Sequence, residues 1–269
     1  IYMGGGTPTT LSVEELERLL GWIDEGIDLD ALREFTVEAG RPDTITTEKL
    51  RVVRKHGVDR VSVNPQTMSD AVLEAIGRKH SAADIEEALR QVREVGGFAV
   101  NMELIAGLPT DTEESFRHTV DRVLALEPEN ITVHTLSTKR GARLRFGEGT
   151  LPSDGAVEAM LDYANGRLRD MGYGPYYLYR QKNMSGGFDN VGWTRPGFEN
   201  LYNVCIMEEL CSILAAGAGG STKLIRRDGG KNGRFVAPKY PLEYCESIER
   251  ICREKEKIEE FYRQTDGGT

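Results

Sequence analysis

The first half of the chain alternates short apolar runs with segments in which apolar residues recur every three or four positions. The apolar runs lie near residues 2–3, 34–38, 60–63, 98–105 and 131–136. Runs of this length are typical of strands, whereas the spacing of Leu16, Leu19, Leu20 and Ile23 is typical of one helix face. Five such units in a row predict an α/β fold, with a parallel sheet that is either open and doubly wound or curved toward a barrel.

Local signals place the ends of several predicted helices. Ser12 and Glu15 have the spacing of a capping box at the start of the first helix. Gly57 is expected to end the second helix, because glycine tolerates the left-handed backbone that commonly follows a helix. Asp111 and Glu114 are expected to cap the helix that precedes the fifth strand.

The organisation changes beyond about residue 143. A helix is predicted over Val157–Leu168, followed by an aromatic, strand-like segment at Gly172–Tyr179. A glycine-rich run lies at Ala216–Lys223, and the last helix is predicted to include Tyr244–Ile258. We therefore divide the chain into residues 1–145, which hold the strand-helix units, and residues 146–269, a C-terminal α+β extension.

Composition sets limits on the class of protein. The chain has 269 residues, of which 39% are hydrophobic and 29% charged, and it contains no apolar stretch near the ~20 residues that a membrane span requires. Its four cysteines match neither a disulfide scaffold nor a zinc site, so a cytoplasmic setting is expected and no metal ligand is assigned. Cys245 and Cys252, seven residues apart, are predicted to be buried in one helix.

Charge is distributed unevenly between the two halves. Residues 1–137 carry 14 basic and 25 acidic residues, a net charge of −11, whereas residues 138–269 carry a net charge of +2. The acidic balance argues against a nucleic-acid partner. The relatively basic second half is compatible with a small anionic ligand or with ordinary surface charge.

Polar residues gather where the predicted strands end. Three glycines precede Thr7 directly after the first strand, which is typical either of a tight turn or of backbone offered to a ligand. Glu38, Gln66 and Glu103 lie at or near the ends of later strands, the face where active sites form in barrels. A carboxylate within an apolar strand, as at Glu103, is costly unless it has a partner. Together these residues indicate a pocket.

Four motifs follow one another in a fixed order. They are Gly4-Gly5-Gly6-Thr7-Pro8-Thr9, Val37-Glu38, Val63-Asn64-Pro65-Gln66 and Asn101-Met102-Glu103-Leu104-Ile105-Ala106-Gly107-Leu108-Pro109. In this order they resemble the oxygen-independent coproporphyrinogen III oxidase group of radical S-adenosylmethionine (SAM) enzymes. The segments 34–42 and 179–184 are most similar to the coproporphyrinogen dehydrogenase branch of spore-forming bacteria. The resemblance extends over most of the chain, from Ile1 to at least Lys223.

The resemblance implies a fold and a reaction. The fold would be a radical SAM (β/α)6 partial barrel in which a 4Fe-4S cluster cleaves S-adenosylmethionine. The resulting radical would start the oxidative decarboxylation of two propionates of coproporphyrinogen III, giving protoporphyrinogen IX in haem biosynthesis. An electron donor and an electron acceptor would be required as partners.

The resemblance also implies cofactor-binding residues. Gly5, Gly6 and Thr7 would meet the methionine end of S-adenosylmethionine. Four further positions match family contacts to the cofactor: Glu38, Gln66, Arg78 and Glu103. Arg78 is the cation of this set and suits a carboxylate. No residue is assigned to catalysis, and no ligand is assigned to the glycine-rich run at 217–220.

One family feature is missing from this sequence. The chain contains no C-x3-C-x2-C motif, so the cysteines that would hold the cluster are absent. Because the chain begins at Ile1 inside an apparent strand, we expect a fragment whose barrel is incomplete and lacks its first strand. Such a fragment is expected to be inactive alone, and marginally stable or associating through an open sheet edge.

Two other functions stay open at this point. Relatives in the same family bind haem and transfer it without oxidising coproporphyrinogen, and would be distinguished by haem uptake without release of carbon dioxide. The four histidines show no pair suited to haem, and His134 is expected to be a core or pocket residue. A barrel enzyme acting on a phosphorylated metabolite would retain phosphate and would not respond to S-adenosylmethionine.

Overall fold

The computed structural model describes residues 1–137, 151–179, 187–226 and 228–266. Its contacts divide the chain into two compact units, Ile1–Tyr202 and Asn203–Thr269. The division by contacts follows Tyr202, because two strands from residues 174–194 join the sheet of the first unit.

A seven-stranded sheet forms the centre of the first unit, with the order β1-β2-β3-β4-β5-β7-β6. The strands are β1 (Tyr2–Met3), β2 (Thr36–Glu38), β3 (Arg60–Ser62), β4 (Ala99–Ala106), β5 (Asn130–Thr135), β6 (Gly174–Tyr179) and β7 (Asn190–Thr194). The first five pair in parallel and in chain order, whereas β7 pairs antiparallel with both β5 and β6. Because the order of the parallel strands never reverses, the sheet curls as in a barrel and is not doubly wound, which confirms one of the two predicted topologies.

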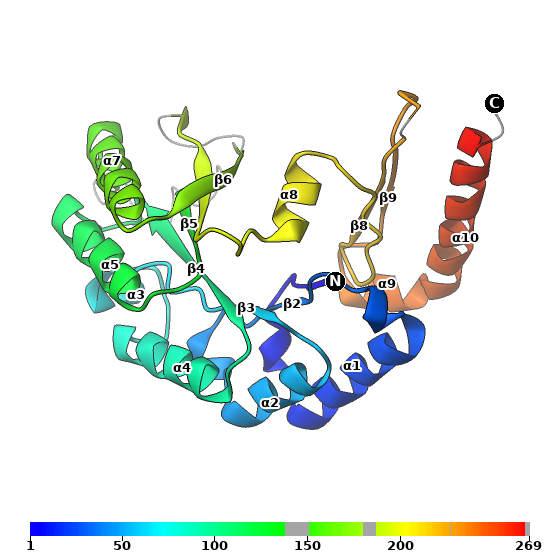
Figure 1. The fold of residues 1–269 in the computed structure, drawn as a ribbon, viewed down its shortest axis with the longest axis horizontal. Helices are drawn as coiled ribbons and strands as arrows, with labels where there is room; N and C mark the ends of the chain where they lie inside the picture. Colours follow the sequence, from blue (N-terminus) through cyan, green and yellow to red (C-terminus); the bar gives the residue numbers. More distant parts are fainter. Residues whose placement is uncertain (138–150, 180–186, 227, 267–269) are drawn as a thin grey trace. The chain divides into compact units, whose positions relative to one another are not determined.

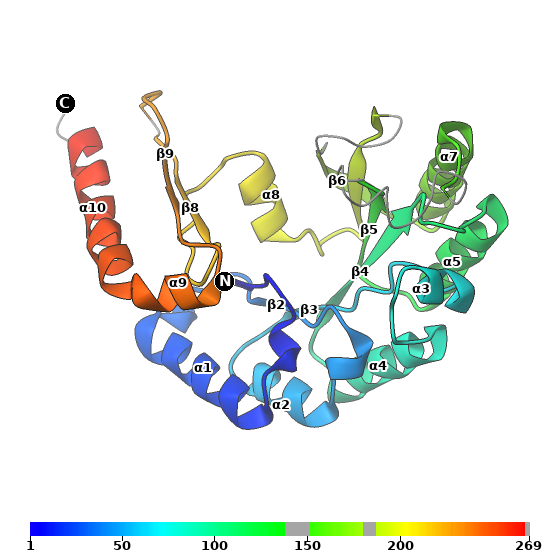
Figure 2. The same cartoon turned by 180° about the vertical axis from the view of Figure 1, so that it is seen from behind.

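Helices cover the convex side of this sheet (Figures 1 and 2). They are α1 (Val13–Gly26), α2 (Thr47–Lys55), α3 (Asp70–Ala75), α4 (Ala82–Val95), α5 (Glu113–Ala125) and α7 (Asp154–Asp170). Short 3-10 helices lie at Pro8–Thr10, Leu29–Ala31 and Pro42–Thr44. Each parallel strand is thus followed by helical structure that buries one sheet face.

Strand β4 shows how the two sheet faces differ. Val100, Met102 and Leu104 are at most 1% exposed and belong to the core between sheet and helices. Asn101 and Glu103 alternate with them and therefore point to the opposite, concave face. The concave face is where the strands carry their polar residues.

The helix ends agree with the sequence in two cases and differ in a third. Ser12 and Glu15 form the predicted capping box, and Gly57 has φ +81° just after α2. At α5 the cap is Thr112, whose side chain accepts from the Ser115 N–H, so the predicted Asp111–Glu114 cap is wrong. Asp111 is buried instead, and it accepts hydrogen bonds from the Thr112 N–H and the Ser115 hydroxyl.

A segment at 195–202, which we call the floor segment, follows β7 and contacts the amino-terminal ends of the parallel strands. Arg60, at the start of β3, donates to the side chain of Asn130 and to the Phe198 carbonyl, the latter at 3.0 Å. Its Nε also lies 3.5 Å from the carboxylate of Glu34, which in turn accepts from the Leu201 N–H. These buried polar contacts close the end of the sheet opposite to the predicted site.

The second unit is small. It contains a hairpin of β8 (Ser221–Leu224) and β9 (Gly233–Val236), with α9 (Pro241–Glu246) and α10 (Ile248–Asp266), while α8 (Leu201–Met207) spans the unit boundary. The glycine-rich run forms the turn before β8, where the Gly219 N–H donates to the Pro238 carbonyl. The predicted last helix is thus two helices, because α9 ends at Glu246 and Ser247 follows as its C-cap.

The two cysteines near the end of the chain are not where the sequence predicted them. Cys245 and Cys252 are both exposed, so the prediction that they are buried is wrong: they lie on two different helices, not on one buried face.

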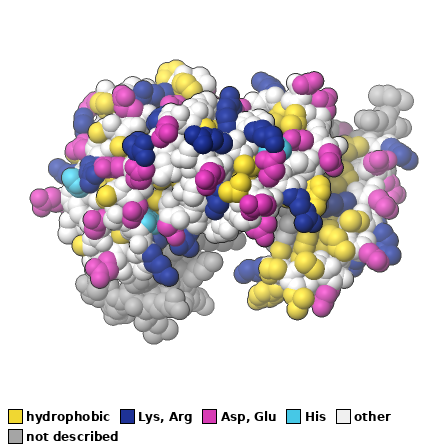
Figure 3. All heavy atoms as spheres, turned by 90° about the horizontal axis from the view of Figure 1, so that it is seen from below, with side chains coloured by type: hydrophobic (Ala, Val, Ile, Leu, Met, Phe, Trp, Pro, Cys, Tyr) yellow, Lys and Arg dark blue, Asp and Glu magenta, His cyan; other side chains and the backbone are white. Residues whose placement is uncertain are grey.

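Within the described ranges, no helix is both long and apolar enough to cross a bilayer. On the face shown in Figure 3, basic and acidic side chains are interspersed, and no continuous basic area is visible there.

Candidate functional site

The glycine-rich loop leaves β1 at the carboxyl-terminal edge of the sheet, beside the end of β2. Strand β1 pairs with β2 in parallel, so residues 4–6 emerge next to Glu38. The Tyr2 phenol donates a hydrogen bond to the Glu38 carboxylate. The Tyr2 ring also stacks on Tyr202, with centroids 4.1 Å apart. The Glu38 carboxylate therefore lies between the Tyr2 side chain and the backbone of the glycine-rich loop.

The fold places different demands on the three glycines. A Cβ on Gly4 would lie 2.7 Å from the Tyr2 ring and 2.8 Å from the Glu38 carboxyl carbon, so Gly4 makes room for this pair. Gly5 has φ +109°, a backbone conformation that side chains rarely adopt. Gly6 has neither constraint, since a Cβ at this position would have no atom within 4 Å. The fold alone does not explain Gly6, whereas close approach of a ligand would.

The ionisation of Glu38 is shifted by its surroundings. Burial raises the pKa of its carboxyl group, and the nearby charge of Glu103 raises the pKa further. The Tyr2 phenol and the Gly5 N–H oppose the shift by donating hydrogen bonds to the carboxylate. Burial likewise raises the pKa of Tyr2, so its phenol stays protonated as a donor. Neutralisation by a cationic ligand would relieve the cost of this buried charge.

The backbone of Gln66, which follows β3, is hydrogen-bonded to β4 on both sides of Leu104. Its N–H donates to the Glu103 carbonyl and its own carbonyl accepts from the Ile105 N–H, both at 2.9 Å. Its φ of +68° is a left-handed conformation that is uncommon for a residue with a side chain. Held backbone strain of this kind is characteristic of binding sites. The structure thus brings Gly5, Glu38, Glu103 and the backbone of Gln66 to one region.

Glu103 has a second neighbour on the concave face that sequence patterns did not identify. The His134 Nε2 lies 3.6 Å from a Glu103 carboxylate oxygen, and the His134 Nδ1 lies 3.1 Å from the Tyr179 hydroxyl. These residues come from β4, β5 and β6. His134 therefore has partners on both ring nitrogens, which agrees with the expectation of a core or pocket residue.

Arg78 occupies a different position. It lies in the turn after α3, and its backbone N–H donates to the Leu73 carbonyl at 2.9 Å. Within the described residues no hydrogen bond or ion pair is found for its guanidinium, although its charge helps to lower the pKa of His80, where burial is the larger cause. The structure does not place Arg78 in contact with Glu38 or Glu103. Thr7 is the N-cap of the Pro8–Thr10 helix, and its carbonyl accepts from Thr10.

Sequence reasoning missed Tyr2, expected His134 only as a core or pocket residue without naming its partners, and missed Tyr179. Their importance depends on partners in other strands, 36, 31 and 45 positions away respectively. One signal was present in the sequence: tyrosine and histidine alternate with apolar residues in the strand segments that contain them. That pattern marks the face of a strand but not its partner.

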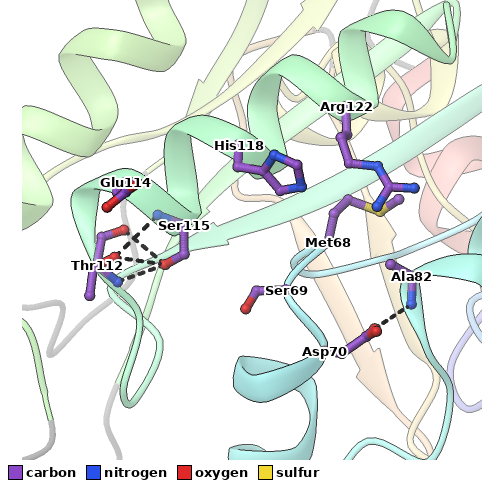
Figure 4. Close-up of a pocket in the computed structure, with 9 residues that line it drawn as sticks. All are labelled: Met68, Ser69, Asp70, Ala82, Thr112, Glu114, Ser115, His118 and Arg122. Atoms are coloured by element: carbon purple, nitrogen blue, oxygen red, sulfur yellow. Dashed lines mark hydrogen bonds between the residues drawn. The ribbon is translucent and has the colours of Figure 1, made fainter.

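A pocket of about 540 Å³ lies elsewhere, in the helical layer between α3, α4 and α5 (Figure 4). The figure shows Asp70 directed at the Ala82 N–H, from which it accepts a hydrogen bond at 2.7 Å, and Ser115 bonded to Thr112. Arg122 is ion-paired with Glu86. None of the residues that line this pocket belongs to the concave-face site, so the two are separate.

Comparison with known proteins connects this geometry to a family. Residues 1–123 match the model of the radical SAM superfamily. These residues form a radical SAM domain. It is 43% identical, over 98% of its length, to the oxygen-independent coproporphyrinogen-III oxidase-like protein HemZ of Bacillus subtilis. It is also 34% identical, over 84% of its length, to the heme chaperone HemW of Lactococcus lactis.

The solved structure of the coproporphyrinogen III oxidase HemN from Escherichia coli shares the fold. The TM-score is 0.72 with 22% sequence identity, covering 93% of this chain and 56% of that one. The radical SAM partial-barrel fold predicted from the sequence is thereby confirmed. The chain spans 54% of HemZ and 58% of the Lactococcus HemW, somewhat more than half the length of each.

The residues present fit one of the two expected cofactors. Glu38, Glu103 and the exposed backbone at 5–6 offer acceptors and donors suited to the ammonium, sulfonium and carboxylate groups of S-adenosylmethionine. For a cluster, no group of three or more His, Cys, Asp or Glu side chains is placed to hold a metal within the described residues. No step is therefore assigned to a cluster on these residues.

Proposed function

We propose that this chain is the part of a radical SAM coproporphyrinogen III dehydrogenase that binds S-adenosylmethionine and forms the concave wall of the reaction chamber. One observation carries the proposal. Glu38 and Glu103 lie together at the glycine-rich loop, and in the described part of the chain neither is paired with Lys or Arg. Two partly buried carboxylates without a Lys or Arg partner favour a cationic ligand, and S-adenosylmethionine carries two positive groups.

Each proposed contact has a role that its chemistry supports. Glu38 accepts from the ammonium group, and the Gly5 and Gly6 backbone lies against the carboxylate end of the methionine. Gln66 offers an amide donor and acceptor, and Arg78 supplies a cation for a carboxylate. Glu103 faces the second positive group. Thr7 fixes the loop through its carbonyl, which accepts from the Thr10 N–H and hydroxyl.

When bound with the cluster of the parent protein, S-adenosylmethionine supplies the 5′-deoxyadenosyl radical that removes hydrogen from a propionate side chain. This chain's residues orient the cofactor and restrict water at the concave face. The substrate of the parent protein would be coproporphyrinogen III, with a separate electron donor and acceptor, in the cytoplasm. Loss of two carbon dioxide molecules would give protoporphyrinogen IX.

A second function is favoured by a specific observation. Relatives named as heme chaperones match 84% and 91% of this chain at 34% and 28% identity. The alternative is therefore a haem-binding and haem-transfer protein of the same superfamily. It would use the same cofactor region without oxidising coproporphyrinogen.

The test is anaerobic turnover by the full-length protein with reconstituted iron-sulfur, reductant, S-adenosylmethionine and coproporphyrinogen III. Formation of protoporphyrinogen together with 5′-deoxyadenosine is expected. Replacing Glu38 by Gln should abolish product, whereas replacing the exposed Glu94 on α4 should not. Haem binding without any porphyrinogen product would instead support the haem-binding and haem-transfer function.

A further inference from the structure

Strand β6 places three tyrosines in contact because its pairing with β7 is irregular. Pro175 pairs with Trp193 and Tyr177 with Gly192, so the register skips Tyr176 as an additional residue. The Tyr176 ring meets the Tyr177 ring edge-on, with centroids 4.7 Å apart, and Tyr177 and Tyr179 lie nearly parallel at 6.3 Å. β-Bulges are enriched beside active sites, where they redirect side chains. We call Tyr176, Tyr177 and Tyr179 the tyrosine wall.

The tyrosine wall reaches across one strand to the next. Gly192 on β7 pairs with both Tyr177 on β6 and Thr132 on β5. A Cβ on Gly192 would overlap the Tyr177 ring, so only glycine lets this ring lie flat over β7. The Tyr177 hydroxyl then lies 3.1 Å from the Thr132 hydroxyl. The Tyr177 ring is thus fixed on one side by Gly192 and at its hydroxyl by Thr132 on another strand, so its orientation is defined by the fold.

The chemistry of this surface differs from that of the carboxylate region. Tyr177 contacts the uncharged Thr132, which donates to Asn101, and His134 bonds Tyr179. Burial raises the pKa of Tyr177, so its phenol stays neutral. The charge of Glu103 reaches Tyr177 only as a minor contribution to its raised pKa, after burial. Aromatic faces bordered by neutral hydroxyls bind rings that present π faces and N–H donors. A pyrrole has both features.

We propose that the tyrosine wall is the contact surface for the pyrrole rings of a tetrapyrrole, beside the cation-binding carboxylates. The proposal rests on the function proposed above, because that function supplies the tetrapyrrole. Tyrosine rings pack against a pyrrole and their phenols accept its N–H hydrogen bonds, while the buried Thr132 hydroxyl holds the Tyr177 phenol in place. The two ligands would thus occupy adjoining parts of one concave face, joined at Glu103 and His134.

The test measures two affinities in the full-length protein. One is for the air-stable porphyrin coproporphyrin III, followed by fluorescence, and the other is for S-adenosylmethionine, followed by calorimetry. The variants are Gly192→Ala, which displaces the Tyr177 ring, and Tyr177→Phe, which keeps the ring and removes the hydroxyl. Leu178→Ala is the matched control, because Leu178 lies on the same strand and is 64% exposed.

We expect Gly192→Ala to weaken porphyrin binding about tenfold and Tyr177→Phe about threefold, with S-adenosylmethionine affinity unchanged. Leu178→Ala should change neither affinity. Equal porphyrin affinity in wild type, Gly192→Ala and Tyr177→Phe would overturn the proposal, as would a wild type that binds S-adenosylmethionine but no porphyrin. If wild type binds porphyrin and the variants weaken it, yet no protoporphyrinogen forms in turnover, the tyrosine wall stands and the dehydrogenase assignment fails. A thermal melt of Gly192→Ala shows whether this variant is folded. If Gly192→Ala is unfolded, the porphyrin affinity of Tyr177→Phe alone tests the proposal.

Discussion

The Tyr2 phenol donates a hydrogen bond to the Glu38 carboxylate across the first two strands of the sheet. This bond selects the charged form of a carboxyl group whose burial favours the neutral form. Tyr2 therefore keeps Glu38 available as an anion and fixes its direction next to the Gly5 N–H. A cationic ligand meets a carboxylate that is already oriented.

Tyr2→Phe should shift the ionisation of Glu38. The ring stack on Tyr202 is retained, but the donor is lost, so the pKa of Glu38 rises further. Its carboxyl resonance, followed by NMR with carbon-13-labelled glutamate, should titrate at higher pH than in wild type, and S-adenosylmethionine should bind about three- to tenfold more weakly near neutral pH. Tyr202→Phe is the control, because among the described residues no hydrogen bond joins its hydroxyl to Glu38. An unchanged Glu38 titration in Tyr2→Phe would contradict the role given to the phenol.

Gly4→Ala and Gly6→Ala should separate folding from binding. The methyl group on Gly4 would approach Tyr2 and Glu38 to within 3 Å, so we expect a loss of about 1–3 kcal/mol in the free energy of unfolding. The methyl group on Gly6 meets nothing within 4 Å, so stability should stay unchanged while S-adenosylmethionine affinity falls. Urea unfolding and calorimetry on both variants test this difference. Full affinity in Gly6→Ala would mean that the ligand does not approach that residue.

Glu38→Gln should stabilise the ligand-free protein while weakening ligand binding. The pKa of Glu38 is raised on folding, so ionising it costs stability. That cost is absent below the ordinary glutamate pKa near 4.3 and grows as pH rises through the raised folded value. The variant should therefore gain stability over wild type as pH increases, by up to about 1 kcal/mol at neutral pH. Thermal melts at several pH values measure the gain, and a loss of stability at neutral pH would show that Glu38 is instead paired in the native state.

The parallel part of the fold could be predicted because its signals are local. Each apolar run is bounded by turn residues, and Ser12 with Glu15 marks a helix start within four positions. A carboxylate inside an apolar strand, as at Glu103, indicated a site before any partner was known. The chemistry of charged groups at strand ends is therefore visible in a single sequence.

The rest depends on pairing between distant segments. Strand β7 joins the sheet through Thr132 and Gly192, sixty positions apart, and hydrophobic periodicity contains no information about that register. The glycine at 192 has a purpose only once Tyr177 lies over it. The Asp111–Glu114 cap was predicted wrongly because Thr112 competes for the same role and Asp111 is buried among other donors.

Arg60→Met should strongly destabilise the first unit. Arg60 is 6% exposed, and it neutralises Glu34 while donating to Asn130 and to the Phe198 carbonyl of the floor segment. Methionine fills similar space but leaves the buried Glu34 carboxylate without its cation, so we expect a loss of about 3–5 kcal/mol in the free energy of unfolding.

Arg90→Met is the control for this change. Arg90 forms ion pairs with Glu87 and Glu94 but its side chain is 62% exposed, so its removal should leave stability almost unchanged. Chemical denaturation of both variants, followed by tryptophan fluorescence, compares them directly; Trp193 is buried in this unit. Equal stability of the two variants would mean that the floor segment does not hold the strand ends together. Restoration of stability in Arg60→Met by the second change Glu34→Gln would show that the unpaired carboxylate causes the loss.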